Sequence, residues 1–268
     1  MPRVKLIAIP STFTADEKNL LLRTYKIGMV ARACSTFGIT DVGVYYDPDP
    51  MFESHGLGRF IVKVLKYLNT PPYLRKTAFE IDNSLRYIGV TEPLKTPHHL
   101  DKEYRVPYRY AFVIRDEKKM LKVTDGSREY WVRKSKAYKE GERIVVIDTK
   151  KLVVVDKHDL PIYFGYDVFY FNRELKYLLK KLQNRNFLII GTSRYGDDIR
   201  DVNIPRREKI AIIFGSPFRG LREILHEEKM IKYFDYYINI VPNQLVKTIR
   251  TEEAIFYTLA ILRYKGVI

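Results

Sequence analysis

Short apolar runs alternate with amphipathic segments at both ends of the chain. Apolar runs with the length of buried strands occur at 4–9, 42–46, 187–190, 210–214 and 236–241. Apolar residues at helical spacing occur at 14–37, 57–68, 175–182 and 251–263. The order strand, helix, strand, helix near the N-terminus predicts a parallel α/β unit.

The expected helix boundaries rest on capping signals. Thr14 and Glu17 fit a capping box at the start of the first helix, and Gly38 fits its end. Thr251 is a suitable N-cap for the last helix, and Glu252 follows where the helix dipole favours negative charge. The single cysteine, Cys34, excludes an intramolecular disulfide, and we expect it to be a small buried residue of the first helix.

Residues 91–165 have a different pattern. Short β-branched and aromatic runs without a helix signal lie at 110–114, 120–123, 130–132, 143–148 and 151–155, with turn signals between them. We expect a small OB-like barrel here, inserted into an α/β domain formed by 1–90 and 166–268. Exposed aromatic residues on such a barrel would stack on RNA bases, for which the candidates are Tyr108, Tyr110, Tyr130 and Trp131. Alternatively, half of these residues belong to the barrel core, and for Trp131 we expect the core.

The net charge of the 268-residue chain is +15, and it is spread along the whole sequence. There are 12 basic against 8 acidic residues in 1–90, 17 against 12 in 91–165, and 18 against 12 in 166–268. This balance favours a polyanionic partner such as RNA, although a charged, solvated surface would give the same composition. No apolar run approaches the ~20 residues that span a bilayer. We therefore expect a cytoplasmic protein with no membrane partner.

Two apolar runs near the C-terminus end in loops suited to ligand binding. The run 210–214 ends at Gly215, with Gly220 five residues later, and the run 236–241 ends at Pro242. In an open α/β sheet, ligands bind at the carboxyl ends of neighbouring strands. The chain has no phosphate-binding glycine loop after a strand, which argues against a nucleotide-dependent enzyme of another kind.

These loops resemble the second and third motifs of the SPOUT superfamily, the α/β-knot S-adenosylmethionine-dependent RNA methyltransferases. The second motif stands as Ile213–Leu221 and the third as Ile240–Ala254. The resemblance implies a knotted C-terminal half that binds S-adenosyl-L-methionine. The cofactor-binding residues it implies are Gly191, Thr192, Ser193, Phe214, Gly215, Ser216, Gly220, Ile240, Pro242, Leu245, Thr248 and Ile249.

The catalytic residues implied are Arg32, Arg250 and Glu252. Residues 29–42 resemble the first SPOUT motif, which places Arg32 in the active site, and Arg250 would hold phosphate or stabilise a base anion. Glu252 or Glu253 could accept a proton, or both could simply be acids stabilised by the helix dipole. Lys26 stands where ribose-methylating members often carry asparagine, which favours a base nitrogen of rRNA or tRNA as the target.

The segment 94–99, which ends in Pro97-His98-His99, resembles one SPOUT branch with an OB-like insertion, which includes archaeal methyltransferases and a centromere-associated eukaryotic relative. The resemblance also implies a homodimer through the first and last helices, with Arg32 reaching the partner's cofactor loops. We expect no metal at His98 and His99, since no further ligand lies at zinc spacing, and we interpret 47–50 as a turn. The alternative function is a knotted RNA-binding protein that has lost methyl transfer.

Overall fold

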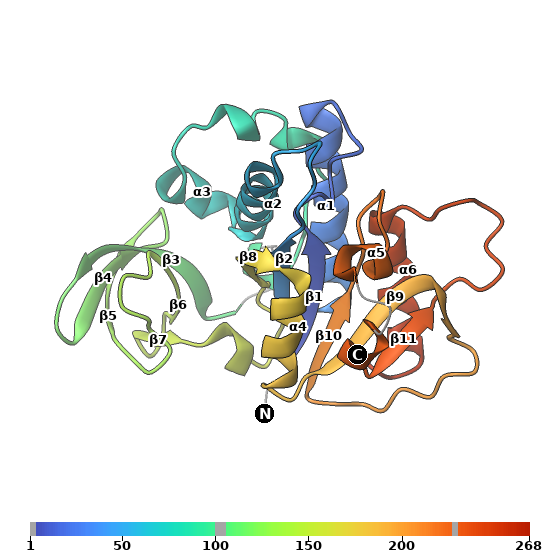
Figure 1. The fold of residues 1–268 in the computed structure, drawn as a ribbon. Coiled ribbons are helices and arrows are strands. Elements are labelled where there is room, and N and C mark those ends of the chain that lie inside the picture. Colours follow the sequence, from blue (N-terminus) through green and yellow to red (C-terminus); the bar gives the residue numbers. More distant parts are fainter. Residues whose placement is uncertain (1–3, 100–105, 227–229) are drawn as a thin grey trace.

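The computed structural model describes residues 4–99, 106–226 and 230–268, and it consists of a parallel sheet with helices on both faces and a separate barrel (Figure 1). Neighbouring strands of the sheet pair in parallel. Their spatial order is β11 (Tyr236–Asn239), β9 (Leu188–Asp198), β10 (Lys209–Ile213), β1 (Val4–Pro10), β2 (Asp41–Tyr46) and β8 (Asp167–Glu174).

Alternate residues of the central strands point to opposite faces of the sheet, and helices bury both. On β1, Ile7 and Ile9 pack with the first layer and Leu6 and Ala8 with the second. The first layer contains α1 (Leu20–Phe37), α2 (Ser54–Asn69) and α6 (Thr251–Tyr264). The second contains α4 (Leu175–Gln183) and α5 (Leu221–Leu225). Cys34 is fully buried in the first layer, as predicted.

Both predicted helix starts differ from the structure. The helix α1 begins at Leu20, because Asn19 accepts a hydrogen bond from the Leu21 amide and is the N-cap. The predicted capping-box segment instead continues a run of tight turns that begins at Ser11, and Phe13 within that run is buried in the core. At α6 the N-cap is Arg250 and not Thr251, and the Glu253 carboxylate accepts from the Arg250 amide at 2.9 Å.

Three further differences lie in the sheet and its connections. The strand β9, predicted to end at Gly191, continues to Asp198 beyond an irregularity in its pairing with β11. The edge strand β8 and the helix α3 (Pro72–Ala78) were not predicted. Pro72 lies in the first turn of α3, where proline is favoured, although we interpreted it as the end of the preceding helix.

The chain also contains short 3-10 helices, which are η1 (Asn83–Leu85), η2 (Ile88–Val90), η3 (Pro97–His99), η4 (Lys157–Asp159) and η5 (Met230–Tyr233).

The inserted segment forms a closed five-stranded barrel, as predicted. Its strands are β3 (Tyr108–Asp116), β4 (Met120–Thr124), β5 (Glu129–Arg133), β6 (Ile144–Asp148) and β7 (Val153–Val155), closed in the order β3-β4-β5-β7-β6. Small apolar side chains fill its interior: Ala111, Leu121, Val123, Val132, Val145, Ile147 and Val154. The barrel confirms the fold class, whereas the domain boundaries at 90/91 and 165/166 and the knot stay predictions.

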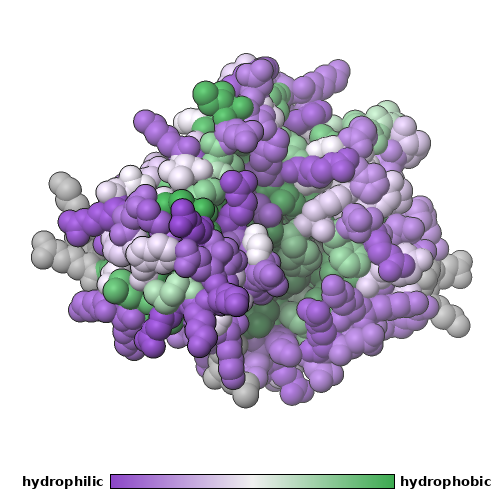
Figure 2. Space-filling model, turned by 90° about the vertical axis from the view of Figure 1, so that its left-hand side faces the viewer, coloured by the Kyte–Doolittle hydropathy of each residue, from purple (hydrophilic) through white to green (hydrophobic). Residues whose placement is uncertain are grey.

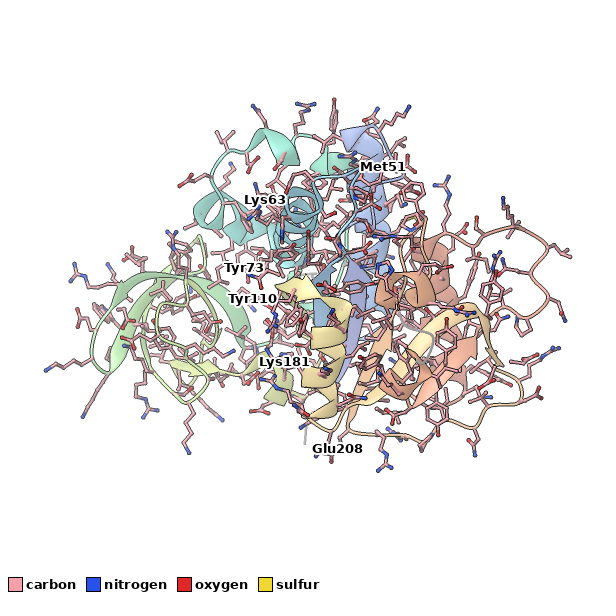
Figure 3. The ribbon with its side chains drawn as sticks, viewed as in Figure 1. Met51, Lys63, Tyr73, Tyr110, Lys181 and Glu208 are labelled. Carbon is pink, nitrogen blue, oxygen red and sulfur yellow. The ribbon has the colours of Figure 1, made fainter. Side chains whose placement is uncertain are left out.

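Aromatic and histidine side chains join the barrel to the α/β part. Tyr73 of α3 and Tyr110 of β3 lie next to each other (Figure 3), and the Tyr110 amide donates to the Tyr73 hydroxyl at 3.1 Å. The Tyr110 ring stacks on Phe164. His98 and His99 both place Nε2 near the Asn69 carbonyl oxygen, at 3.0 and 3.3 Å, and burial lowers the pKa of His99 to about 4. These histidines are therefore part of the junction.

Within the described ranges, no helix combines the length and the apolar character needed to cross a membrane.

Candidate functional site

A pocket of about 230 Å³ lies where β10 and β11 end, and residues 192–195 within β9 also line it. Three neighbouring strands thus bring three segments together, at the edge of the sheet where parallel α/β sheets bind ligands. The predicted cofactor-binding residues that line it are Thr192, Ser193, Phe214, Gly215, Ser216, Gly220, Ile240, Thr248 and Ile249. Residues that line it and were not predicted include Arg194, Arg219, Glu223, Tyr237, Asn239 and Thr251.

Three of the predicted cofactor-binding residues do not line this pocket. A Cβ on Gly191 would lie 2.8 Å from the Phe234 ring, so this glycine permits β9 to pack against its neighbours. Leu245 is fully exposed on the loop between β11 and α6, and Pro242 is half-buried near the start of that loop.

The loop after β10 is shaped by its own hydrogen bonds. The Ser216 amide donates to the Arg219 carbonyl at 2.9 Å, and the Ser216 hydroxyl accepts from the Arg219 amide at 2.9 Å. A Cβ on Gly215 would lie 3.0 Å from the Arg219 carbonyl oxygen, so this tight turn favours glycine. At Gly220, an added Cβ would meet only the flexible carboxylate of Glu223, at 2.8 Å. The turn therefore presents backbone at the pocket wall.

A buried ion pair fixes this loop to the end of β2. Arg219 Nη2 donates to Asp47 Oδ1 at 2.6 Å and to the Pro48 carbonyl at 2.8 Å, and Asp47 also accepts from the Thr12 hydroxyl at 2.5 Å. Burial raises the pKa of the Asp47 carboxyl, against the effect of these hydrogen bonds. Asp47, which we interpreted as part of a plain turn, thus anchors the loop after β10. The Asp-Pro-Asp-Pro sequence of residues 47–50 is typical of a turn, so it did not indicate this ion pair.

The opposite wall of the pocket is tied together by side chains of β9 and β11. Arg194 Nη1 donates to the Lys247 carbonyl at 3.0 Å, and Asn239 Nδ2 donates to the Arg194 carbonyl at 3.0 Å. Thr251 Oγ1, at the start of α6, donates to the Gly215 carbonyl at 3.3 Å. The three segments that line the cavity are therefore linked to one another.

A cluster of charged groups lies behind the first turn of α6. The buried Lys26 ammonium is 2.7 Å from an oxygen of Asp16 and 3.4 Å from Glu252 Oε2. Glu252 is itself buried, does not line the pocket, and its Oε2 has no hydrogen bond. Arg250 Nη1 lies 3.1 Å from Glu17 and 3.8 Å from Glu252 Oε1. Two of the predicted catalytic residues therefore meet in this cluster.

The third predicted catalytic residue lies elsewhere in the single chain. Arg32 Nη1 donates to the Pro93 and Leu94 carbonyls at 2.7 and 3.2 Å, and Arg32 does not line the pocket. Its helix, α1, packs against α6. The structure therefore brings Arg250 and Glu252 together without Arg32.

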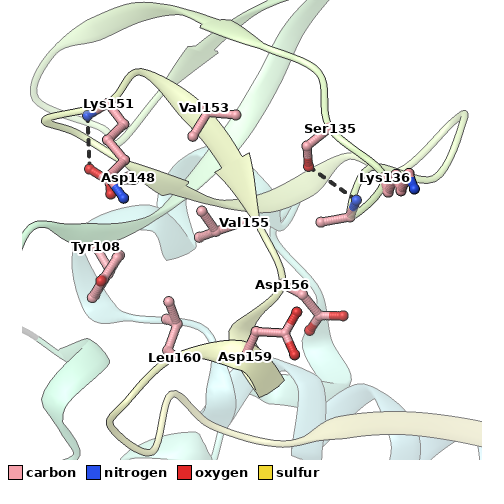
Figure 4. Close-up of a pocket in the computed structure, with 11 residues that line it drawn as sticks. Tyr108, Ser135, Lys136, Asp148, Lys151, Val153, Val155, Asp156, Asp159 and Leu160 are labelled. Carbon is pink, nitrogen blue, oxygen red and sulfur yellow. Dashed lines mark hydrogen bonds between the residues drawn. The ribbon is translucent and has the colours of Figure 1, made fainter. Parts of the chain in front are cut away.

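A second cavity, of about 540 Å³, opens between the barrel and the segment that follows β7 (Figure 4). Its lining mixes opposite charges, including Lys136, Lys151 and Asp159. Asp148, also in the lining, already accepts hydrogen bonds from the Lys150 and Lys151 amides, both at 2.9 Å. Part of its lining is thus a hydrogen-bonded turn. This cavity lacks the converging chain segments that line the 230 Å³ pocket.

Comparison with known proteins assigns the chain to a family. Residues 5–262 match the model of the family described as "Putative RNA methyltransferase", and the chain belongs to this family. It is 27% identical to a 28S rRNA (uridine-N(3))-methyltransferase of Mus musculus, over 98% of this chain and 76% of that protein. It is also 27% identical to the protein of that name in Homo sapiens, over 98% and 78% of the two chains.

A solved structure with similarity to the chain is the SpoU methyltransferase AviRb from Streptomyces viridochromogenes in complex with AdoMet. The matched region covers 98% of this chain and 59% of the AviRb chain, with 9% identity and a TM-score of 0.42. The family membership confirms the predicted class. The protein is an RNA methyltransferase, and its methyl donor is S-adenosyl-L-methionine.

Proposed function

We propose that the protein methylates a base nitrogen, N3 of uridine in ribosomal RNA, with S-adenosyl-L-methionine bound in the pocket beside β9 and at the ends of β10 and β11. The observation that carries the proposal is the convergence of the three predicted loops on one cavity. The uridine-N(3) target comes from the names of the mouse and human relatives. It agrees with Lys26, which replaces the asparagine expected in ribose-methylating members.

The lining of the pocket suits the cofactor. S-adenosyl-L-methionine supplies a methyl group that its sulfonium already activates. Backbone at Gly215 and Gly220 permits close approach, Phe214 and Ile240 provide apolar surface, and Thr192 offers a hydroxyl. These residues bind and orient a ligand that carries no phosphate, and the chain correspondingly has no phosphate loop.

Methylation at N3 of uridine requires removal of the proton from that nitrogen. Glu223 is the carboxylate that lines the pocket within the described residues, and we propose it as the proton acceptor. The Glu223 carboxylate would take up the N3 proton, and S-adenosyl-L-methionine bound in the pocket would supply the methyl group from its sulfur to that nitrogen. We propose that Glu252, which lies 3.4 Å from Lys26 and 3.8 Å from Arg250, acts as a positioning residue for the Arg250 guanidinium.

Glu223→Gln is expected to lower the rate of methyl transfer by about 10²- to 10⁴-fold without weakening cofactor binding. The assay follows transfer of a labelled methyl group to rRNA at saturating S-adenosyl-L-methionine, and calorimetry measures cofactor affinity. Asp235→Asn is a control, since this carboxylate accepts from the Ile189 amide outside the pocket lining. Full activity of Glu223→Gln would remove this residue from the mechanism.

We also propose a homodimer through α1 and α6 that shares its active sites. Leu22, Tyr25, Met29 and Arg32 recur at helical spacing on a partly exposed stripe of α1. On α6, Tyr257 is 44% exposed, whereas Ile255, Leu259 and Leu262 are buried in the chain's own core. An isologous contact would cover both exposed stripes and bring Arg32 toward the partner's loops.

Tyr257→Glu is expected to split this dimer, because it places a charge in an apolar interface, and to abolish activity. Sedimentation equilibrium measures the mass, and Ile81→Glu is the control, since Ile81 is fully exposed outside both helices.

Mixing Arg32→Ala with Gly220→Val chains should restore one working site per heterodimer. A fully active wild-type monomer would contradict the shared site.

A further inference from the structure

Trp131 projects from the outer face of the barrel with an exposed fraction of 43%. Along β5 its neighbours Tyr130 and Val132 pack toward the barrel interior, so strand alternation directs the indole outward. Our expectation that Trp131 belongs to the core was therefore wrong. Within the described residues the indole forms no hydrogen bond, ring contact or cation contact.

The other aromatic candidates of the barrel are already engaged. Tyr110 is buried and stacks on Phe164, and Tyr108 meets the same ring edge-on. The Tyr130 hydroxyl donates to Asp125 at 3.1 Å. Of the four aromatic residues expected at an RNA-binding face, Trp131 is thus the one whose ring is free to stack on a base.

Cationic side chains lie beside the indole in a row across three strands. Lys122 of β4 is the register partner of both Trp131 on β5 and Arg115 on β3. Directly opposite residues of an antiparallel pair share one face, so these three side chains point outward together. Arg133 follows on the same face of β5, and it is exposed.

The carboxylates on this face leave its basic side chains available to a phosphate group. Lys122 lies 2.6 Å from Glu129, and Arg115 lies 3.7 Å from Glu117, but both carboxylates are about half exposed. Exposed ion pairs of this kind contribute at most about 1 kcal/mol, so a phosphate can replace the carboxylate. The barrel side of the molecule is largely hydrophilic (Figure 2). On β3, β4 and β5 the large exposed apolar side chains are Ile114 and Trp131.

We propose that the outer face of β3, β4 and β5 binds a single-stranded segment of RNA, with one base stacked on Trp131 and the adjoining phosphates near Lys122, Arg115 and Arg133. A single indole among cations matches the alternation of flat base and charged phosphate along a strand. A docking site for protein would carry a broader apolar centre. The inference rests on the proposed function, since RNA is the substrate, and it adds a second contact outside the cofactor pocket.

Because Trp131 is the single tryptophan of the chain, its fluorescence reports directly on this contact. Titration of the full-length protein with an eight-nucleotide oligouridylate should quench the tryptophan emission saturably, with the same midpoint as the anisotropy of fluorescently labelled RNA. Increasing salt should weaken binding, with a slope of about −0.7 in log K against log salt for each phosphate contact.

Trp131→Ala is expected to weaken RNA binding by about 5-fold to 100-fold, measured by anisotropy, because a stacked base is lost. Trp131→Phe retains a ring and should recover most of the affinity. Lys122→Ala should reduce the salt slope by about 0.7. Exposure of these side chains predicts unchanged melting temperatures, and calorimetry should show unchanged affinity for S-adenosyl-L-methionine.

RNA binding without quenching, with wild-type affinity in Trp131→Ala, would overturn the proposal. So would quenching that depends on protein concentration without RNA, which would show that a second copy covers the indole. The test is separable from the proposed function. Methyl transfer with an inert Trp131 refutes only this RNA contact, whereas RNA stacking on Trp131 without any methyl transfer refutes only the proposed enzymatic reaction.

Discussion

Gly220→Val is expected to reduce the affinity for S-adenosyl-L-methionine by more than about 100-fold while the chain stays folded. The backbone of Gly220 has φ −73° and ψ 174°, which any residue adopts. The side chain would displace only the Glu223 carboxylate, and it would project at the wall of a cavity of about 230 Å³. Two added methyl groups beyond Cβ therefore occupy space that the cofactor needs. Calorimetry measures the affinity, and thermal unfolding measures the fold.

Two substitutions serve as controls for this prediction. Gly220→Ala adds only the Cβ and should weaken the cofactor less than valine does. Gly89→Val places the same side chain where an added Cβ has nothing within 4 Å, and it should change neither affinity nor stability. Wild-type affinity in Gly220→Val would show that the cofactor does not contact this loop.

Lys26→Met is expected to lower the free energy of unfolding by about 3–5 kcal/mol, because it removes the cation from a buried ion cluster. Lys26 is 3% exposed, and the Glu252 side chain that faces it is 4% exposed. Loss of the ammonium leaves the buried Glu252 carboxylate near Asp16 with only the largely exposed Arg250 guanidinium, 3.8 Å from Glu252, to compensate their charge. Since α6 borders the pocket through Thr251, methyl transfer should fall as well. Urea unfolding measures the change.

The triple variant Lys26→Met, Glu252→Gln, Asp16→Asn separates charge from packing. Neutral amides in place of both carboxylates should recover most of the lost stability, because no uncompensated buried charge remains. A triple variant as unstable as Lys26→Met would mean that the lysine stem, and not its charge, stabilises this part of the chain.

Hydrophobic patterning predicted the central sheet and the barrel because their strands are buried and bounded by turn residues. It failed at β8, whose apolar residues 168–171 run without a turn signal toward the helix α4 at Leu175. It also ended β9 at Gly191, a glycine that packs against Phe234 within a continuing strand. Local sequence does not distinguish a glycine that ends a strand from one that permits close packing.

The sequence predicted the glycine-containing segments of the candidate site, whose backbone shape depends on local residues. It did not predict the contacts between side chains that are distant in the sequence. The glycine loops carry their own signal, and most of their expected residues line one cavity. The contact between Arg219 and Asp47, and that between Lys26 and Glu252, join residues more than 170 positions apart, so no spacing reveals them. For Trp131, aromatic character alone could not decide between the interior and the exterior of the barrel.

The most direct test of the central claim is transfer of a mass-labelled methyl group from S-adenosyl-L-methionine to ribosomal RNA by the purified protein. Nucleoside mass spectrometry of the digested product identifies the methylated position. We expect labelled 3-methyluridine, and we expect none of it with the Gly220→Val chain. A label on a ribose 2′-hydroxyl, or unlabelled RNA from a protein shown to bind both cofactor and RNA, would contradict the claim.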